Sequence, residues 1–507
     1  MCPNPASFQK VELFHSPYLK RLIFSQSTDK LTFLFVVFQL KNILFEFFCI
    51  IIISLEETKM RTKLLSFKLS GIKSLQKEIE LKFSNYLLKD PSKNIAKVKS
   101  IYGVNGAGKT SVVLGMKILT EFLRSPDYLS ENRVILNDLI NYNTDTFSAT
   151  ILFSTFDNNE KLMNIFRYST KFTKIENSFI IVNESLDLLS GNNLKGNAKN
   201  IFDISNGQIQ NINCSDLTYK QKLISNYNNL LLKSSFLSLH PALEINSNDE
   251  IIIDNKEKVP FSYAIISLFQ FTNSVLTFTD RDNIPVNPNL HFEMLKNYVQ
   301  DQSNHPDKIN NINKNRITVA KKNYPSFIKM TNQLEKFIKL FKPELKQIKL
   351  DSVEAGNDFL LVSRTFDYGG KSLINEYLES TGIKRINQLF QFLDFSIKGG
   401  IVFIDELDAS ISSIYLLKLL QYFEKAGKGQ LCFTCHNTYL MRAIQDYKFS
   451  IDFISSDGKI KSWTKSGHYL PEDQFTKGYI PGFAFNTVDL DFFEVFPTEE
   501  VSTQNDK

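Results

Sequence analysis

The sequence predicts an α/β protein that combines a mixed sheet, an antiparallel β subdomain and a helical insertion. The glycine-rich segment GVNGAGKTS follows a short apolar strand at 98–102 and precedes a helical apolar pattern at 112–122. A run of four apolar residues, 401–404, ends in an acidic pair, which is typical of a parallel strand buried on both faces. Residues 146–186 contain three strand-length runs with short polar linkers, which predict antiparallel hairpins.

The other elements follow in chain order. Strands are predicted at 64–69 and 79–83, and Asn- and Gly-rich residues 187–215 predict a loop or irregular hairpin. Longer helical patterns fill 216–345, and strands return at 346–350 and 359–366. These patterns divide the chain into five segments: an upstream segment (1–59), an N-terminal lobe (60–215), a mostly helical insertion (216–345), a C-terminal lobe (346–450) and a C-terminal extension (451–507).

Composition sets broad limits on the class of protein. A length of 507 residues is enough for two or three domains with a large core. The formal net charge of +5 comes from 59 Lys and Arg against 54 Asp and Glu, so global charge makes no case for nucleic acid. Five cysteines do not make a disulfide framework. We therefore expect a protein of the reducing cytoplasm.

The first 59 residues differ from the rest of the chain. Residues 31–53 are apolar and long enough to span a bilayer, but Lys41 and Glu46 interrupt their middle. The segment also starts too far from residue 1 for a signal peptide. Met60 opens a proper first strand, and the preceding Glu56 and Glu57 back-translate to a purine run that resembles a ribosome-binding site. We favour a start at Met60 over a membrane segment or a buried or disordered extension.

The glycine-rich segment matches the phosphate-loop pattern G-x-x-x-x-G-K-[ST] in full. Backbone N–H groups of such a loop point at phosphate oxygens, and the following helix adds its positive end. Lys109 is expected to reach the β- and γ-phosphates, and the Thr110 hydroxyl to hold Mg²⁺. A chance glycine-rich turn is the alternative. The sequence thus predicts a P-loop NTPase that binds a nucleoside triphosphate and Mg²⁺ through Gly103, Asn105, Gly106, Ala107, Gly108, Lys109, Thr110 and Ser111.

The acidic pair ends the second diagnostic strand, where an α/β sheet places its ligands. Asp405 can hold the same Mg²⁺ as Thr110, and Glu406 can take a proton from the attacking water. A solvated strand end is the alternative for an isolated Asp-Glu pair. Together with Lys109, Glu406 is a predicted catalytic residue.

The segment DELD, the phosphate loop and the long insertion between them resemble the ABC-type ATPase heads of the SMC and OLD group. The resemblance is strongest to the bacterial AAA-family branch, which includes abortive-infection ATPases, and it covers roughly residues 60–210 and 345–450. Branch members often continue the acidic motif as SLHP. Residues 410–413 read SISS here, so the chain departs from that submotif.

ESTGIKR at 379–385 resembles the signature segment of this branch. The resemblance implies that Ser380 and Gly382 of one copy contact the γ-phosphate bound by a second copy, as a helix N-terminus can. An ordinary helix N-cap is the alternative. We therefore expect a homodimer or a higher homo-oligomer.

The segment CFTCH, 432–436, contains the C-x-x-C-H pattern of c-type haem attachment. On a strand, residues 432 and 435 point to opposite faces and cannot hold one cofactor together. The resemblance instead implies that His436 contacts the γ-phosphate or orients water, as the third catalytic residue. A structural histidine is the alternative, and no haem is expected.

The resemblance implies an ATP-hydrolysing sensor or switch subunit in bacterial phage defence or abortive infection. No nuclease motifs follow residue 450, so a separate nuclease or toxin is the expected effector. A DNA-repair or chromosome-associated SMC-like clamp is the alternative, although 216–345 lack sustained heptads. A transporter subunit would need an LSGGQ signature. A set of basic residues leaves nucleic acid open as a partner, beside a solvated helical face: Lys314, Arg316, Lys321, Lys322, Lys336 and Lys339.

Overall fold

The chain consists of two units, Met1–Met60 and Arg61–Lys507, and the second contains the fold described below. The apolar segment at 31–53, part of the predicted helical insertion and the end of the predicted C-terminal extension lie outside the described residues. None of the described helices is long and apolar enough to cross a membrane. The computed structural model describes residues 60–85, 94–191, 194–214, 216–227, 230–243, 261–279, 317–356, 358–370, 373–455, 457–465 and 470–480.

A six-stranded sheet forms the centre of the second unit, in the order β17-β16-β3-β15-β14-β9. The five strands from β16 to β9 are parallel, and β17 pairs antiparallel with β16. All residues of β3, β14, β15 and β16 are buried, as expected for parallel strands covered on both faces. The strands are β3 (Val98–Tyr102), β9 (Val275–Phe278), β14 (Ile401–Ile404), β15 (Gln430–Thr434), β16 (Ile451–Ile454) and β17 (Ile460–Ser462).

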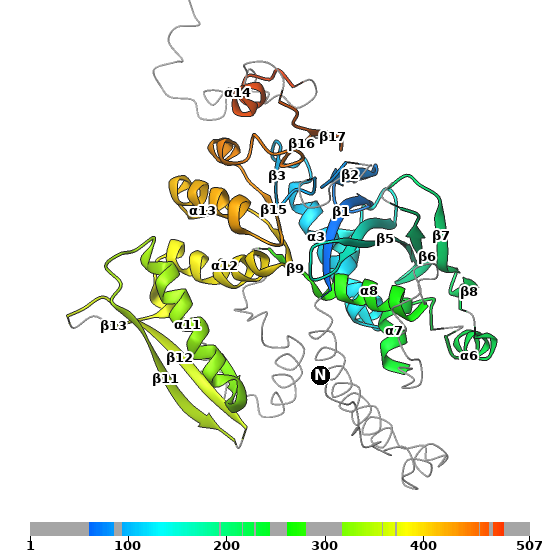
Figure 1. The fold of residues 1–507 in the computed structure, drawn as a ribbon, viewed down its shortest axis with the longest axis horizontal. Helices are drawn as coiled ribbons and strands as arrows, with labels where there is room; N and C mark the ends of the chain where they lie inside the picture. The colour runs from blue at the N-terminus through cyan, green and yellow to red at the C-terminus, as the bar shows by residue number, and fades with distance from the viewer. Residues whose placement is uncertain are drawn as a thin grey trace, which may run out of the picture. The chain divides into compact units, whose positions relative to one another are not determined.

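Helices cover both faces of this sheet (Figure 1). Helix α3 (Lys109–Arg124) packs on one face, in the same hydrophobic cluster as Phe403. Helices α12 (Thr381–Lys398) and α13 (Ser413–Ala426) pack on the other face, in the cluster that contains Val402. Consecutive residues of β14 thus pack into separate hydrophobic clusters on opposite faces of the sheet. This is the two-sided burial predicted from the apolar run at 401–404.

The antiparallel β subdomain is a seven-stranded sheet in the order β2-β1-β4-β5-β6-β7-β8. The hairpins predicted from 146–186 are confirmed as β4, β5 and β6. Within 187–215, β7 and β8 form a hairpin with a register shift between Asp203 and Ile204, which agrees with the irregular hairpin expected there. Its turn places Asn206 and Gly207 at φ 48° and 75°, the two-residue type that favours Asn-Gly. The strands are β1 (Arg61–Ser70), β2 (Ile79–Lys82), β4 (Thr146–Phe156), β5 (Leu162–Ile175), β6 (Ser178–Leu189), β7 (Ala198–Ser205) and β8 (Gln208–Ile212).

A buried glutamine fastens the two sheets together. Gln430, at the start of β15, donates to the carbonyls of Leu64 (2.9 Å) and Ala96 (3.2 Å). Its own side-chain oxygen accepts from the backbone N–H of Leu64 at 2.7 Å. A buried amide is stable only when its donors and acceptors find partners, and Gln430 meets this condition by bridging β1 and β15.

A smaller antiparallel sheet packs against α11 (Tyr324–Lys339) in a hydrophobic cluster of its own, which also includes side chains of α12. The Arg364 guanidinium forms two bonds to the Glu376 carboxylate, at 2.8 and 3.0 Å, which joins this sheet to the segment before α12. The sheet consists of β10 (Ile317–Ala320), β11 (Gln347–Ala355), β12 (Phe359–Asp367) and β13 (Leu373–Asn375).

The described part of 216–345 is mostly helical, but it also provides strands. Within the helical pattern expected over 216–345, α8 ends at Asn273, and β9 follows as an edge strand of the central sheet. Apolar runs of four residues do not distinguish strand from helix in a sequence. The other helical segments are α4 (Tyr128–Glu131), α5 (Arg133–Leu139), α6 (Leu217–Tyr227), α7 (Phe236–Leu243), α8 (Phe261–Asn273), α14 (Pro471–Thr476), η3 (Lys321–Asn323), η4 (Glu376–Leu378) and η5 (Thr438–Ala443).

Candidate functional site

The glycine-rich loop connects the end of β3 to the first turn of α3. Gly106 and Gly108 have φ values of 82° and 101°, in the left-handed region that favours glycine. A Cβ on Gly103 would lie 2.4 Å from the carbonyl oxygen of Ile454, so a side chain has no room there. The loop tip at Asn105 and Gly106 is exposed. These features fit a backbone cradle that is open to an anion at the N-terminus of α3.

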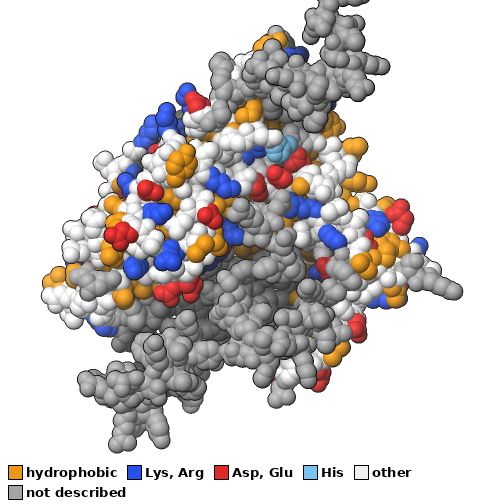
Figure 2. Space-filling view, turned by 180° about the vertical axis from the view of Figure 1, so that it is seen from behind, with side chains coloured by type: hydrophobic (Ala, Val, Ile, Leu, Met, Phe, Trp, Pro, Cys, Tyr) orange, Lys and Arg blue, Asp and Glu red, His pale blue; other side chains and the backbone are white. Residues whose placement is uncertain are grey.

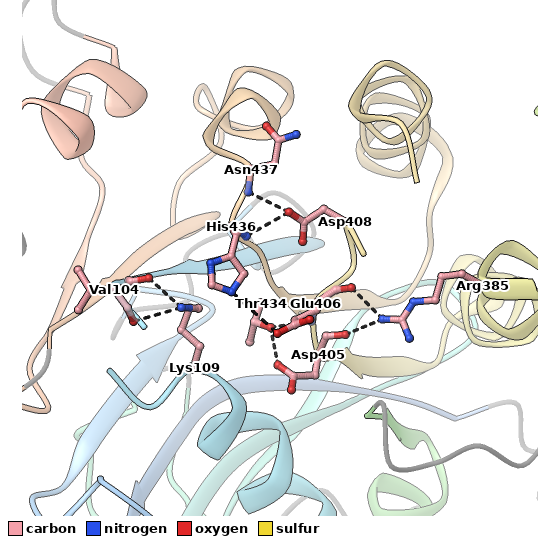
Figure 3. Close-up of polar contacts among 10 residues, drawn as sticks. Val104, Lys109, Arg385, Asp405, Glu406, Asp408, Thr434, His436 and Asn437 are labelled. Atoms are coloured by element: carbon pink, nitrogen blue, oxygen red, sulfur yellow. Dashed lines mark hydrogen bonds and ion pairs between the residues drawn. The ribbon is translucent and has the colours of Figure 1, made fainter. Parts of the chain in front are cut away.

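Lys109 lies inside this loop. Its Nζ donates to the carbonyls of Gly103 (2.8 Å) and Val104 (3.2 Å), as Figure 3 shows. Burial lowers the pKa of Lys109, while the nearby carboxylates of Asp405 and Glu406 oppose that shift. The acidic pair is thus close enough to Lys109 to affect its pKa. This proximity agrees with the prediction that the phosphate loop and the acidic pair belong to one site.

Thr434 holds the acidic pair in place at the end of β14. Its hydroxyl, which is fully buried, donates to Asp405 Oδ1 at 2.5 Å and accepts from the backbone N–H of Glu406 at 2.8 Å. Glu406 has a left-handed φ of 49°, which is uncommon for a non-glycine residue. This role of Thr434 was not predicted from the sequence. The contact joins the end of β15 to the end of β14, and Thr434 and Asp405 are 29 residues apart in the chain.

His436 follows β15 and faces the acidic turn, with its Nε2 3.9 Å from Glu406 Oε1 (Figure 3). Both side chains are partly exposed, at 48% and 42%. Asp408 fixes the histidine loop, because its Oδ2 accepts from the backbone N–H groups of His436 (3.2 Å) and Asn437 (2.9 Å). The structure therefore brings together Lys109, Glu406 and His436, and it adds Asp408 as a supporting residue.

The two cysteines of CFTCH pack on opposite sides of the central sheet. Cys432 belongs to the cluster that contains α3, and Cys435 belongs to the cluster that contains α12 and α13. Burial raises the pKa of both thiols well above the usual value. The prediction that these thiols cannot hold one cofactor together agrees with this placement.

The signature segment begins α12. Ser380 is the N-cap and accepts from the backbone N–H of Ile383 at 3.4 Å. A Cβ on Gly382 would lie 2.9 Å from the carbonyl oxygen of Ser410, so the helix start packs closely on the segment after the acidic motif. Buried Glu379 anchors the segment by accepting from the Tyr368 hydroxyl at 2.5 Å. None of these described contacts of the signature involves the phosphate loop of the same chain.

Arg385 connects this helix to the acidic turn. Its Nη2 donates to the carbonyl oxygens of Asp405 (2.9 Å) and Glu406 (2.8 Å), and its side chain is buried. The guanidinium carbon lies 4.6 Å from the centre of the Phe278 ring, at the end of β9. Arg385 is the last residue of the signature segment, and no role of its own was predicted for it from the sequence. Nothing in the local sequence indicates that its side chain reaches the end of β14.

The basic residues considered for nucleic acid show mixed surroundings. Lys321 pairs with Glu354 at 2.9 Å, and Lys339 pairs with Glu335 at 2.6 Å. Lys314 and Arg316 lie outside the described residues. Figure 2 shows Lys and Arg side chains interspersed with acidic and apolar ones on the face drawn there. Nucleic-acid binding stays an untested prediction.

Comparison with known proteins gives one family and a group of solved structures. Residues 236–442 match the family model described as "AAA domain, putative AbiEii toxin, Type IV TA system". No match is found among curated proteins. Similar solved structures include an SMC head bound to the C-winged helix domain of ScpA, with 14% identity over 79% of this chain and 98% of that chain and a TM-score of 0.40.

Two further similar structures are SMC head domains. One, from Pyrococcus furiosus, has an extended coiled coil and is bound to the C-terminal domain of ScpA; identity is 13% over 80% of this chain and 96% of that chain, with a TM-score of 0.40. The other is from Thermotoga maritima, with 11% identity over 80% and 100% and a TM-score of 0.32. The family match spans the signature segment, the acidic strand and His436, and together with the phosphate loop it makes the chain similar to P-loop ATPases of the AAA type.

Proposed function

We propose that the chain binds ATP with Mg²⁺ and hydrolyses it with Glu406 as general base. The observation that supports this most directly is the convergence of Lys109, Asp405, Glu406 and His436 at the carboxyl ends of β3, β14 and β15. Lys109 exchanges its bonds to the loop carbonyls for bonds to phosphate oxygens. Glu406 removes a proton from the attacking water, and the neighbouring His436 orients that water or contacts the γ-phosphate.

The donor set fits magnesium. Thr110 provides a hydroxyl at the start of α3, and Asp405 provides a carboxylate of which one oxygen is used by Thr434. Mg²⁺ prefers such hard oxygen ligands and keeps several waters. When bound, the ion neutralises developing charge on the phosphates.

A second copy completes the site in this proposal. Ser380 and Gly382 lie at the N-terminus of a helix of 18 residues, where partial positive charge suits a γ-phosphate. Their described contacts run to their own segment and to Ser410, not to the phosphate loop of the same chain. ATP would join two heads, and hydrolysis would release them, so that the chain acts as a switch.

For the biological role, we propose a cytoplasmic sensor subunit in bacterial phage defence that acts through a separate nuclease or toxin. The family description supports this direction, because it names a putative AbiEii toxin and a type IV TA system. The test measures ATP hydrolysis by the purified chain with Mg²⁺, with and without DNA, RNA and phage protein. Stimulation by one of these identifies the trigger, and an absence of hydrolysis under all conditions contradicts the proposed activity.

Replacing Thr434 with valine tests the support of the acidic pair. Valine keeps the shape of threonine but removes both hydroxyl bonds, so Asp405 and the Glu406 turn lose their common partner. We expect kcat to fall about 10-fold to 100-fold, as for a misplaced catalytic group. Thr434→Ser keeps the hydroxyl and should restore most of the rate. Equal rates for the valine and serine variants would contradict this role.

Replacing His436 with alanine tests the histidine. Its ring is partly exposed and contacts Glu406, whereas the loop is held through backbone N–H groups, so the loop should survive the change. We expect turnover to slow at least about 10-fold with little change in nucleotide affinity. Steady-state hydrolysis and a fluorescent-nucleotide titration measure the two quantities. Unaltered turnover would favour a purely structural histidine.

A further inference from the structure

Arg385 is a buried cation in the first turns of the signature helix, and its bonds run to backbone oxygens of the acidic turn. One nitrogen, Nη2, donates to two consecutive carbonyls, those of Asp405 and Glu406. Charge-assisted hydrogen bonds of this kind are stronger than neutral ones and orient the groups that they join. The backbone of the catalytic turn is thus attached directly to α12 (Figure 3).

The turn needs such support because of its conformation. Glu406 is held at a φ of 49°, a left-handed geometry that surrounding contacts must stabilise in a residue with a side chain. On one side, Thr434 accepts from the Glu406 N–H, and on the other side Arg385 donates to the Glu406 carbonyl. The two contacts therefore hold the backbone of Glu406 on both sides of its Cα, at its N–H and at its carbonyl oxygen.

The same helix start also touches the segment beyond the turn. Gly382, three residues before Arg385 in the chain, lies against the carbonyl oxygen of Ser410. Phe278 packs below the guanidinium and accepts, through its carbonyl, from the backbone N–H of Asp405 at 2.8 Å. The N-terminus of α12, the acidic turn and the end of β9 therefore form one continuously bonded group.

We propose that Arg385 is a positioning residue for Asp405 and Glu406 of its own chain. The helix that presents Ser380 to the partner's nucleotide then also sets the geometry of the general base in its own site. This inference rests on the proposed dimeric ATPase. Arg385 would then link two sites within each chain. One is the partner's nucleotide site, which Ser380 of this chain completes, and the other is the site in which Glu406 of this chain hydrolyses ATP.

Substitution tests the role in a symmetric dimer first. Arg385→Met should lower kcat at least about 10-fold while nucleotide affinity and ATP-driven dimerisation stay nearly unchanged. Arg385→Lys keeps a charged donor and should recover part of the rate. Lys398→Met removes one positive charge from the exposed far end of the same helix and should behave as wild type. Loss of nucleotide affinity in parallel with kcat would overturn the positioning role.

Mixed dimers then decide which site Arg385 serves. In the first, one chain carries both Arg385→Met and Glu406→Gln and the other chain is wild type; in the second, the two substitutions lie on different chains. Single-turnover hydrolysis is measured, so one competent site suffices, with a dimer of wild-type and Glu406→Gln chains as reference. We expect the first dimer to match the reference and the second to be as slow as the Arg385→Met homodimer.

The reverse order would overturn the inference, because it would mean that Arg385 acts on the partner's nucleotide. Equal rates in the two mixed dimers would also overturn it. Failure of the proposed function looks different, since the wild-type chain itself would then show no ATP-dependent dimer or no hydrolysis. If Arg385→Met is less stable in thermal unfolding, the same pair of mixed dimers is made with Arg385→Lys.

Discussion

Alanine at Lys109 is expected to abolish ATP hydrolysis and to weaken nucleotide binding at least about 100-fold. Lys109 provides the cationic side chain within the phosphate loop, and its Nζ lies between the carbonyls of Gly103 and Val104. Removing it leaves the negative charge of the β- and γ-phosphates without its principal partner. Isothermal titration with ATP and a phosphate-release assay measure the two effects.

Lys77→Ala serves as the matched control, because Lys77 is exposed and the same change there removes a surface charge only. Circular dichroism shows whether the variants keep the fold. Unchanged ATPase activity in the folded Lys109→Ala protein would contradict the assignment of the phosphate loop. Binding without hydrolysis would still support the loop and would confine Lys109 to the chemical step.

The parts of the site that could be predicted are those whose conformation depends on a short run of consecutive residues. The loop from Gly103 to Thr110 encodes its own turn, since positions 106 and 108 need positive φ and glycine provides it. The acidic strand was predictable because a run of buried apolar residues has to end at a ligand-bearing edge of the sheet. The placement of His436 followed from the next strand in the same parallel sheet.

The residues that sequence reasoning missed act through long-range contacts. Thr434, Asp408 and Arg385 each bond across separations of 20 to 29 residues, and each looks ordinary in its local segment. Strand β9 was missed for a related reason, because its four residues continue the apolar pattern of α8 and only pairing with β14 makes them a strand. Local patterns predict elements, whereas the contacts between strand ends depend on which strands become neighbours.

Glutamine at Glu406 is expected to trap an ATP-bound dimer. The substitution keeps the size of the side chain and leaves Asp405 and its bond to Thr434 in place, so nucleotide and metal binding should persist. It removes the base, and hydrolysis should fall at least about 100-fold. Without hydrolysis the contact between the γ-phosphate and the partner's helix N-terminus is not released. Size-exclusion chromatography with light scattering, with and without ATP and Mg²⁺, measures the mass.

Two controls make this outcome specific. Glu354→Gln makes the same change at an exposed carboxylate on β11 and should release the dimer normally, because that side chain is 78% exposed and pairs only with a surface lysine in the described contacts. Adding Lys109→Ala to Glu406→Gln should return a monomer, since the trapped species requires bound ATP. A Glu406→Gln protein that binds ATP and stays monomeric would contradict the two-copy site. A dimer that forms equally without nucleotide would show that dimerisation is independent of ATP, and the switch in the proposed function would then be wrong.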